Sequence, residues 1–375
     1  MADRRVVIVA KWIPHYRVAF LDHLRSRLAA DGVSLEVLYG HAPRGVAAYD
    51  DVELLWGHRV RLTVLRMREQ ELYWPHVLRR TAGADLVIVE QANRVLVNYP
   101  LLLLQRVGRR RIAFWGHGRN FEQRAHGSIS ERLKRRLAAW PHWWFAYTQA
   151  SLQPLAEAGV DPERITVVDN AIDTADLAAT VKTVTPTQIQ AARRGCTGRL
   201  GVFVGTLYAE KRLDLLLAAA DRVVEQVPDF GLIVAGDGPE RQALADAAVT
   251  RPWLKVVGPL FGPEKAALLR AADVMLMPGR VGLVVLDAFV AGVPMVTRNA
   301  ADHAPEVSYV ADGDNAVVVR EESAEAFAMA VVALLSDDDA RLRLAAGARR
   351  SAARYTVEAM AEKFATGVLQ ALQAS

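Results

Sequence analysis

Two loops in the second half of the sequence combine a positive charge with small residues, as phosphate binding requires. Lys211 and Gly282 each stand near the point where a short apolar run gives way to a helical stretch. An ammonium group beside a helix N-terminus neutralises a diphosphate, and glycine lets a ligand approach the backbone closely. We predict that Lys211 and the helix-opening amides of Leu283 and Val284 bind a diphosphate. The alternative for Lys211 is a solvated side chain that begins a helix.

Asp287 lies one turn further along the same helical stretch, on a face that is otherwise apolar. A carboxylate that is buried there needs hydrogen-bond donors, because burial without partners is costly. The hydroxyl groups of a ribose would supply these donors, and so would a salt bridge or a helix cap. The sequence leaves these alternatives open.

A histidine between two glycines follows an apolar run in the first half of the chain. His117 is flanked by Gly116 and Gly118, and glycines let the backbone bring an imidazole close to a ligand. Histidine exchanges protons near neutral pH and also forms hydrogen bonds with sugar hydroxyls. We therefore rank His117 first among the nine histidines as a functional group.

Further polar side chains follow other apolar runs of the first half. His15, Tyr16 and Arg17 come after the first run, and Glu90 ends a later one. We interpret them as contacts to a second substrate or to a phosphate, together with Arg119, just past the glycine-flanked histidine. The alternative is a polar helix start for the first three and a strand-end carboxylate paired with an arginine for Glu90.

These candidates follow apolar runs in the pattern that the whole sequence displays. Short apolar runs alternate with longer amphipathic stretches, which is typical of parallel sheets built from strand–helix–strand units. Ligands bind such sheets beyond the carboxyl ends of the strands. We expect strands at 6–10, 35–39, 86–90, 112–115, 143–147, 165–168, 200–204, 231–235, 254–257, 274–277, 294–296 and 316–319. The helices expected between them include 18–30, 100–108, 130–139, 211–226, 239–249, 263–271, 283–291 and 324–336.

The length of 375 residues predicts two domains. We place the first at 1–175 and the second at 176–354. The segment 170–198 lacks a strand pattern and contains Thr-Val-Thr-Pro-Thr, so we interpret it as the connection. A C-terminal helix at about 355–375 is a candidate to pack back on the first domain.

Composition excludes several classes of protein. Apolar residues make up 52% and charged residues 23% of the chain, so a disordered or fibrous protein is excluded. Cys196 is the only cysteine, which excludes an intrachain disulfide and a cysteine metal cluster. The sequence contains neither an apolar run of about 18 residues, which a membrane span needs, nor clear metal-ligand spacing. We expect a cytoplasmic protein without a metal, whose run 6–10 is a strand rather than a signal peptide.

Positive charge is concentrated in the first half. Residues 1–173 carry 25 Lys and Arg against 18 Asp and Glu, and residues 174–375 carry 21 against 24. This asymmetry indicates an anionic ligand or surface near the first half, or simply an arginine-rich exterior. The basic run 134–136 is compatible with contact to anionic lipid at the membrane periphery and with the wet face of a helix. The arginines are scattered rather than interleaved with exposed aromatic residues, so nucleic-acid binding is not expected.

Several short motifs of the second half occur in an order that resembles a known family. They are Gly205–Asp214, Gly236–Glu240, Ala271–Pro278, Gly282–Ala288, Ala291–Pro294 and Asp312–Asn315. Together they look like the donor domain of glycosyltransferase family 4, the retaining GT-B enzymes that use nucleotide sugars, over about residues 165–340. The resemblance implies two doubly wound Rossmann-like domains facing each other across a cleft. It also implies transfer without a metal or other cofactor, the nucleotide sugar being a co-substrate.

The resemblance assigns roles residue by residue. Lys211 matches the lysine that holds the donor diphosphate, and Asp287 stands where the second glutamate of the family's Glu-x7-Glu pair binds the ribose. Residues 282–284 match the backbone that faces the donor sugar and phosphates, and Leu260 falls where the backbone contacts the base. His117 falls where the family has a histidine facing the donor sugar. The resemblance thus implies that Lys211, Asp287 and His117 are the catalytic residues.

Two positions depart from the family pattern. Gly279 stands where the first glutamate of the pair is expected, and Thr206, next to Gly205, stands where the family usually has a phosphate-binding arginine. The adjacent Arg280 could replace some of the lost charge. These departures leave the identity of the donor sugar open. The expected donor contacts still include Gly205, Thr206, Gly279 and Arg280.

The predicted function is retaining transfer of a sugar, of the hexosyltransferase type, from a UDP-, GDP- or dTDP-linked donor. The acceptor is expected to be a hydroxyl of a saccharide, a lipid-linked or a natural-product molecule. It would be bound by the basic first domain at His15, Tyr16, Arg17, Glu90 and Arg119. Two alternatives stay open: a nucleotide-sugar epimerase of the same architecture, and a non-catalytic partner that binds sugar nucleotides. The sequence does not determine the oligomeric state.

Overall fold

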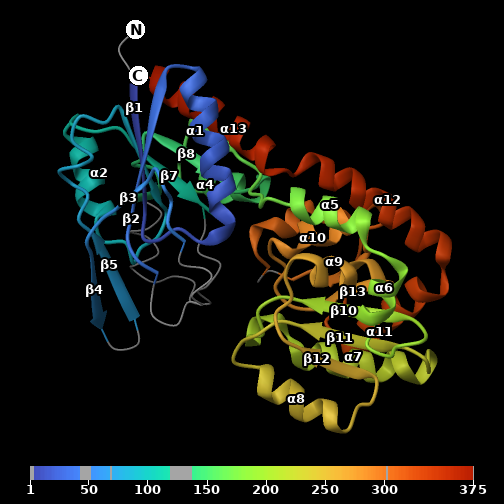
Figure 1. Ribbon diagram of the computed structural model, residues 1–375. Helices are drawn as coiled ribbons and strands as arrows, with labels where there is room; N and C mark the ends of the chain where they lie inside the picture. The colour runs from blue at the N-terminus through green and yellow to red at the C-terminus, as the bar shows by residue number, and fades with distance from the viewer. Residues whose placement is uncertain (1–3, 43–51, 68–69, 119–136, 301–302, 375) are drawn as a thin grey trace. The chain divides into compact units, whose positions relative to one another are not determined.

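The chain divides into two α/β units, which Figure 1 shows in a computed structural model of the protein. Unit 1 consists of Met1–Asp173 and Val357–Ser375, and unit 2 of Thr174–Thr356. The structure describes residues 4–42, 52–67, 70–118, 137–300 and 303–374.

Unit 1 is built around a parallel sheet of seven strands in the order β3-β2-β1-β6-β7-β8-β9. The strands are β1 (Arg4–Ala10), β2 (Val33–Tyr39), β3 (His58–Arg59), β6 (Leu86–Glu90), β7 (Ile112–Gly116), β8 (Trp143–Ala146) and β9 (Ile165–Val167). Two further strands, β4 (Leu62–Met67) and β5 (Gln70–Pro75), form an antiparallel pair of their own. The strand order reverses between β1 and β6, and ligands bind doubly wound sheets at this kind of switch point.

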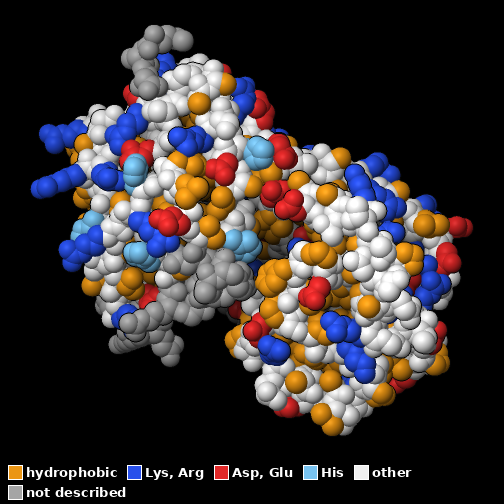
Figure 2. Space-filling model, in the orientation of Figure 1, with side chains coloured by type: hydrophobic (Ala, Val, Ile, Leu, Met, Phe, Trp, Pro, Cys, Tyr) orange, Lys and Arg blue, Asp and Glu red, His pale blue; other side chains and the backbone are white. Residues whose placement is uncertain are grey.

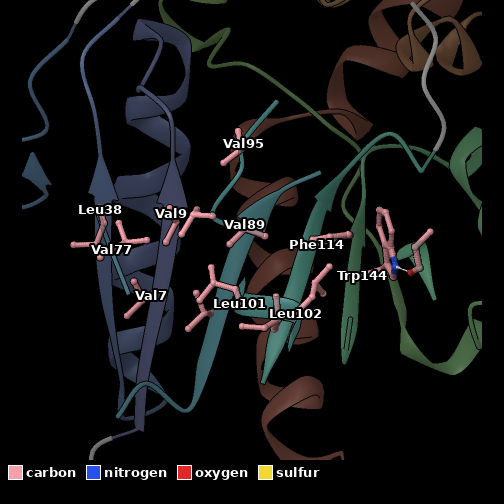
Figure 3. Close-up of a cluster of buried hydrophobic side chains, with 14 of the residues drawn as sticks. Val7, Val9, Leu38, Val77, Val89, Val95, Leu101, Leu102, Phe114 and Trp144 are labelled. Carbon is pink, nitrogen blue, oxygen red and sulfur yellow. Dashed lines mark hydrogen bonds between the residues drawn. The ribbon is translucent and has the colours of Figure 1, made fainter. Parts of the chain in front are cut away.

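Helices cover both faces of this sheet because successive side chains of a strand point to opposite faces. On one face, α1 (Val18–Ala30) lies beside α13 (Val357–Gln373) (Figure 1). On the other face, α2 (Asn98–Arg106) packs inward. Its Leu101 and Leu102 belong to the buried cluster of Figure 3, with Val7, Val89 and Phe114 from three strands. Other helical segments among the described residues of unit 1 are η1 (His15–Arg17), η3 (Gln149–Ser151), α4 (Leu152–Glu157) and η4 (Pro162–Arg164).

Unit 2 contains a parallel sheet of six strands in the order β12-β11-β10-β13-β14-β15. The strands are β10 (Leu200–Val204), β11 (Gly231–Ala235), β12 (Leu254–Val257), β13 (Val274–Met277), β14 (Met295–Arg298) and β15 (Ala316–Val319). The helices are α5 (Ala175–Thr183), α6 (Pro186–Ala192), α7 (Leu213–Gln226), α8 (Arg241–Val249), α9 (Gly262–Ala271), α10 (Val284–Ala291), α11 (Ala324–Ser336) and α12 (Asp338–Arg354), with η5 (Ala209–Lys211) and η6 (Pro305–Tyr309). The switch point lies between β10 and β13.

The predicted fold class of two doubly wound parallel sheets is confirmed, and every expected strand is present within two residues of its expected ends. The segment 170–198, interpreted as the connection, contains no strand but is largely helical. This segment forms α5 and α6, which pack on α9 of unit 2. The side chains of Thr185 and Gln188 form a capping box that starts α6 after Thr185, and this pairing is a helix-start signal. The strands β3, β4 and β5 were not expected, and the expected helix 130–139 lies mostly outside the described residues.

Candidate active site

The loops that follow β10 and β13 meet at the switch point of unit 2. Lys211 Nζ donates a hydrogen bond to the carbonyl oxygen of Arg280 at 2.6 Å. The amide of Arg280 donates in turn to the carbonyl oxygen of Glu210 at 2.8 Å. The sequence predicted that Lys211 and the segment at Gly282 act together, and the structure places these two loops in direct contact.

Gly279 has no room for a side chain, which explains why a glutamate is absent there. A Cβ atom at position 279 would lie 2.2 Å from the carbonyl carbon of Lys211 and 2.4 Å from the carbonyl oxygen of Glu210. These are backbone atoms, so the lysine loop itself would have to move. The close approach that glycine allows therefore serves the packing of the two loops.

Replacing Gly279 by alanine is expected to lower the free energy of unfolding by about 2 kcal/mol or more, because overpacking against backbone forces the loop to shift. The matched control is Gly282→Ala, since a Cβ atom at 282 would meet only Ala304, at 4.0 Å. Its effect on stability is expected to stay within about 0.5 kcal/mol. Denaturant titrations measure both values, and equal stability of the two variants would contradict this explanation.

Lys211 is an almost completely buried cation, with 6% of the residue exposed. Its burial and the neighbouring Arg280 lower the pKa of the ammonium from 10.5 to about 8, while Glu210 and Glu306 oppose the shift. This difference corresponds to about 3 kcal/mol against the charged form. A bound anion would recover this free energy, so the loop is well suited to an anionic ligand.

The backbone near Gly282 is fixed by the segment that follows β14. The amide of Val281 donates to Nδ1 of His303 at 3.0 Å, and Nε2 of His303 faces the carbonyl oxygen of Arg298 at 2.8 Å. The amide of Ala304 donates to the carbonyl oxygen of Val281 at 3.1 Å. The next amides, at Leu283 and Val284, precede the first helical hydrogen bond of α10, which Val285 donates to Gly282. They therefore lie at the positive end of the helix.

Asp287 is buried on α10 and forms a salt bridge with Lys265 of α9. Lys265 Nζ lies 3.1 Å from both carboxylate oxygens of Asp287. Burial raises the pKa of the Asp287 carboxyl, and the charge of Lys265 opposes that shift. Of the alternatives that the sequence left open, the structure contains the salt bridge. Each carboxylate oxygen can accept more than one hydrogen bond, so ribose contact remains compatible with this pair.

The other predicted donor contacts have different exposures. Gly205 is half-buried beside Lys211 and adopts φ 151°. Thr206 is exposed, and Leu260 is half-buried in the loop between β12 and α9.

Sequence reasoning missed three residues around these loops. Glu306 is a buried carboxylate on η6 that acts on the charge of Lys211. His303 ties the loop after β13 to the end of β14, and buried Arg298 donates to the carbonyl oxygen of Pro278. All three lie at or after β14. The one available signal was their place at the carboxyl end of a strand next to β13.

Charged side chains also gather at the switch point of unit 1. Glu90, at the end of β6, interacts electrostatically with Lys11, which follows β1, and with Arg17. Burial raises the pKa of the Glu90 carboxyl, and the two cations oppose this effect. Arg17 is 7% exposed. Within the described residues, no carboxylate lies within ion-pair distance of its guanidinium.

Aromatic rings enclose the Arg17 guanidinium. Its central carbon lies 4.8 Å from the ring centre of Trp115, 5.2 Å from that of Tyr16 and 5.6 Å from that of Tyr147. Cation–π contacts of this kind are stronger when the cation is desolvated. His15, by contrast, is exposed and contacts the Tyr16 ring edge-on. Of the three predicted residues of this loop, Arg17 is thus the one whose side chain is buried in unit 1.

His117 is half-buried after β7 and packs edge-on against Tyr147, with the ring centres 4.4 Å apart. The flanking glycines serve packing. A Cβ atom at Gly116 would lie 2.7 Å from Cβ of Gln91, and Gly118 adopts φ 72°. The Gln91 side chain accepts a hydrogen bond from the Gly118 amide at 2.9 Å. Gln91 therefore holds the histidine loop, while Arg119 lies outside the described residues.

Known proteins share the fold and part of the sequence. Residues 198–337 match the family described as Glycosyl transferases group 1, which confirms the predicted family resemblance. A D-inositol 3-phosphate glycosyltransferase of Corynebacterium urealyticum is 34% identical over 175 residues, 43% of this chain and 40% of the relative. A phosphatidyl-myo-inositol mannosyltransferase of Mycolicibacterium smegmatis is 31% identical over 164 residues, 42% of each chain. The matches thus span less than half the length of these two curated relatives.

Among solved structures, the Anabaena protein Alr3699/HepE in complex with UDP-glucose has a TM-score of 0.69 and 16% sequence identity. The match covers 97% of this chain and 99% of that one, which extends the shared fold to both units. None of the helices in the described residues is long and apolar enough to span a bilayer. In the same part of the chain, no group of three or more His, Cys, Asp and Glu is arranged to hold a metal ion.

Proposed function

We propose, from the match of residues 198–337 to the glycosyl transferases group 1 family, that this chain is a glycosyltransferase with a nucleotide-sugar donor. The observation that carries the proposal is the buried ammonium of Lys211, held against the loop after β13 at the switch point of unit 2. The donor diphosphate binds between this ammonium and the amides at the start of α10. The ribose contacts Asp287 beside Lys265.

The chemistry follows from where negative charge grows. Breaking the bond between the sugar and the diphosphate leaves charge on the phosphate oxygens, and preorganised donors stabilise that charge. Lys211 and the amides of Leu283 and Val284 supply these donors without the aid of a metal. His117 of unit 1 orients the donor sugar, and transfer proceeds with retention of configuration at the sugar carbon, as the family resemblance implies.

We assign acceptor binding to unit 1. Glu90 and Lys11 offer an acceptor and a donor of hydrogen bonds at the carboxyl ends of its strands, and buried Arg17 adds positive charge that acts on Glu90. A hydroxyl group of a saccharide, a lipid-linked or a natural-product acceptor fits this mixture of groups. The UDP-glucose complex of the Anabaena protein makes UDP-hexoses the first donors to test, before GDP- and dTDP-sugars.

The test is incubation of the purified chain with each nucleotide sugar and a panel of acceptors, followed by mass spectrometry of the products. Release of the nucleoside diphosphate with a matching gain of one sugar on an acceptor is expected. Conversion of the donor sugar to its epimer without an acceptor would identify an epimerase instead. Binding of the donor without any product would identify a non-catalytic partner.

The affinity for a nucleoside diphosphate is expected to decline above about pH 8. The ammonium of Lys211 has a pKa of about 8 in the free protein, and a bound anion raises that pKa. Below this pH the lysine is charged in both states, so its protonation does not limit binding. Above it, binding must take up a proton, and the affinity falls by up to about tenfold per pH unit.

Calorimetric titration from about pH 7 to about pH 9.5 measures this effect. Lys211→Arg is the matched control, because a guanidinium stays charged over the whole range. The decline should be absent in any Lys211→Arg protein that still binds. An affinity of the parent protein that does not change over this range would contradict the assignment.

A further inference from the structure

Helix α2 of unit 1 is apolar on both sides. Leu101 and Leu102 point into the buried cluster of Figure 3. Tyr99, Leu103 and Val107 recur at intervals of four, which places them along one stripe of the helix, and they are 37%, 57% and 66% exposed. A surface helix ordinarily presents polar residues to water on this side. We therefore expect the outer stripe to contact an apolar partner.

The segment that contains α2 carries cations and no acidic residue. Residues 91–118 contain five arginines and neither Asp nor Glu. Arg106 and Arg109 are exposed at the C-terminal end of the helix, and Arg110 reaches the carbonyl oxygen of Leu78. This contact brings the turn with exposed Arg79 next to the helix end. Figure 2 shows Lys and Arg side chains projecting from the side of unit 1 that carries α2.

We propose that this outer surface docks on a bilayer of anionic lipids. The α2 surface consists of Tyr99, Leu103 and Val107 with the flanking arginines, Arg106, Arg109 and Arg110. The apolar stripe inserts at the level of the headgroups, where a tyrosine ring is well placed with its apolar body inward and its hydroxyl in water. The arginines bind the phosphate groups around it. The proposal concerns membrane docking and does not depend on the proposed function.

The two kinds of contact must act together. Three apolar side chains bury too little area for stable anchoring, and a cationic surface alone binds weakly at physiological salt. Each arginine near an anionic membrane contributes about a fivefold gain in affinity. Docking should therefore be reversible, dependent on anionic lipid and weakened by added salt.

The experiment is co-sedimentation of the full chain with vesicles of phosphatidylcholine alone or with phosphatidylglycerol included. The parent protein is expected to bind the anionic vesicles and to remain in solution with the neutral ones. Leu103→Asp combined with Val107→Asp should lower the affinity by about tenfold or more, because charged residues are strongly disfavoured in the apolar layer. Arg109→Gln should lower it by about fivefold.

Matched controls lie in unit 2, where Leu342→Asp and Lys182→Gln change exposed residues on α12 and α5. Neither control should change vesicle binding, and the melting temperature of each variant reports on folding. Equal sedimentation of the parent with both kinds of vesicle, or undiminished binding of the folded double variant, would overturn the proposal. If the parent forms a dimer but does not bind vesicles, and the double variant is a monomer, the stripe is instead a contact with a second copy of the chain. That result would also overturn the proposal.

Discussion

Replacing Lys211 by methionine is expected to lower the kcat/KM of sugar transfer by about a hundredfold or more. Under the proposed function, the substitution removes the buried ammonium that stabilises the leaving diphosphate, and loss of one such donor costs on the order of 10²–10³-fold in rate. Methionine keeps much of the length and the apolar stem of lysine. The loop should therefore hold its place, and the melting temperature should not fall, because burial disfavours the charged ammonium. Steady-state kinetics with saturating acceptor measures the effect.

The matched control is Lys255→Met, which removes an exposed lysine of β12 in the same unit. Its kinetics should equal those of the parent. A Lys211→Met protein that transfers sugar at the parental rate would remove Lys211 from the mechanism. A variant that binds nucleoside diphosphate normally but turns over slowly would confine the role of Lys211 to the transition state and contradict its role in holding the donor.

Replacing His117 by alanine is expected to lower kcat by about a hundredfold while the fold is kept. The imidazole contacts Tyr147 just beyond the carboxyl ends of β7 and β8, and loss of a group that orients a reacting sugar typically costs about this much. The donor diphosphate is bound by unit 2 in this account, so its dissociation constant should change little. Rapid-mixing kinetics and a separate titration with the diphosphate distinguish the two effects.

His23→Ala is the control for the loss of an imidazole, since His23 lies partly exposed on α1 with a long contact to Glu358. It should leave turnover unchanged. Parental activity of the folded His117→Ala variant would contradict the assignment. A His117→Gln variant that restores part of the turnover would indicate hydrogen bonding rather than proton transfer as the function of the ring.

Most of the fold followed from the sequence because buried parallel strands are short, continuous apolar runs. The runs at 200–204 and 274–277 became β10 and β13 with the expected bounds. The antiparallel pair of β4 and β5 was missed because its strands lack clean alternation of apolar and polar residues. Helix α6 was missed because Thr-Pro-Thr was interpreted as a linker rather than as the start of a helix.

The candidate site was predictable where a single segment carries the signal. The lysine loop and the glycine loop follow neighbouring strands, so their contact at the switch point could be expected from the strand–helix alternation. The partners of these loops come from other segments. Lys265 reaches Asp287 from a different helix, and Glu306 and His303 follow β14. No local pattern encodes such pairs, because tertiary packing alone decides which side chains meet.

The glycine at position 279, which departs from the family pattern, has a physical cause in the packing of the lysine loop. The sequence presents it as the loss of a sugar-binding glutamate. The structure presents it as a contact between two backbone segments, with 2.2 Å between a hypothetical Cβ and the Lys211 carbonyl carbon. The lysine loop thus lies closer to β13 than any side chain at this position would permit. Under the proposed function, a donor sugar would have to contact other groups, among which Glu306 is a buried carboxylate that acts on the charge of Lys211.

The measurement that tests the central claim most directly is calorimetric titration of the parent and the Lys211→Met variant with UDP, GDP and dTDP. The account predicts that at least one of these diphosphates binds the parent, and that the same ligand binds the folded variant at least about tenfold more weakly, since a charge-assisted contact is lost. Failure of every diphosphate to bind the parent, or equal affinity for both proteins, would contradict the claim that the lysine after β10 holds the donor.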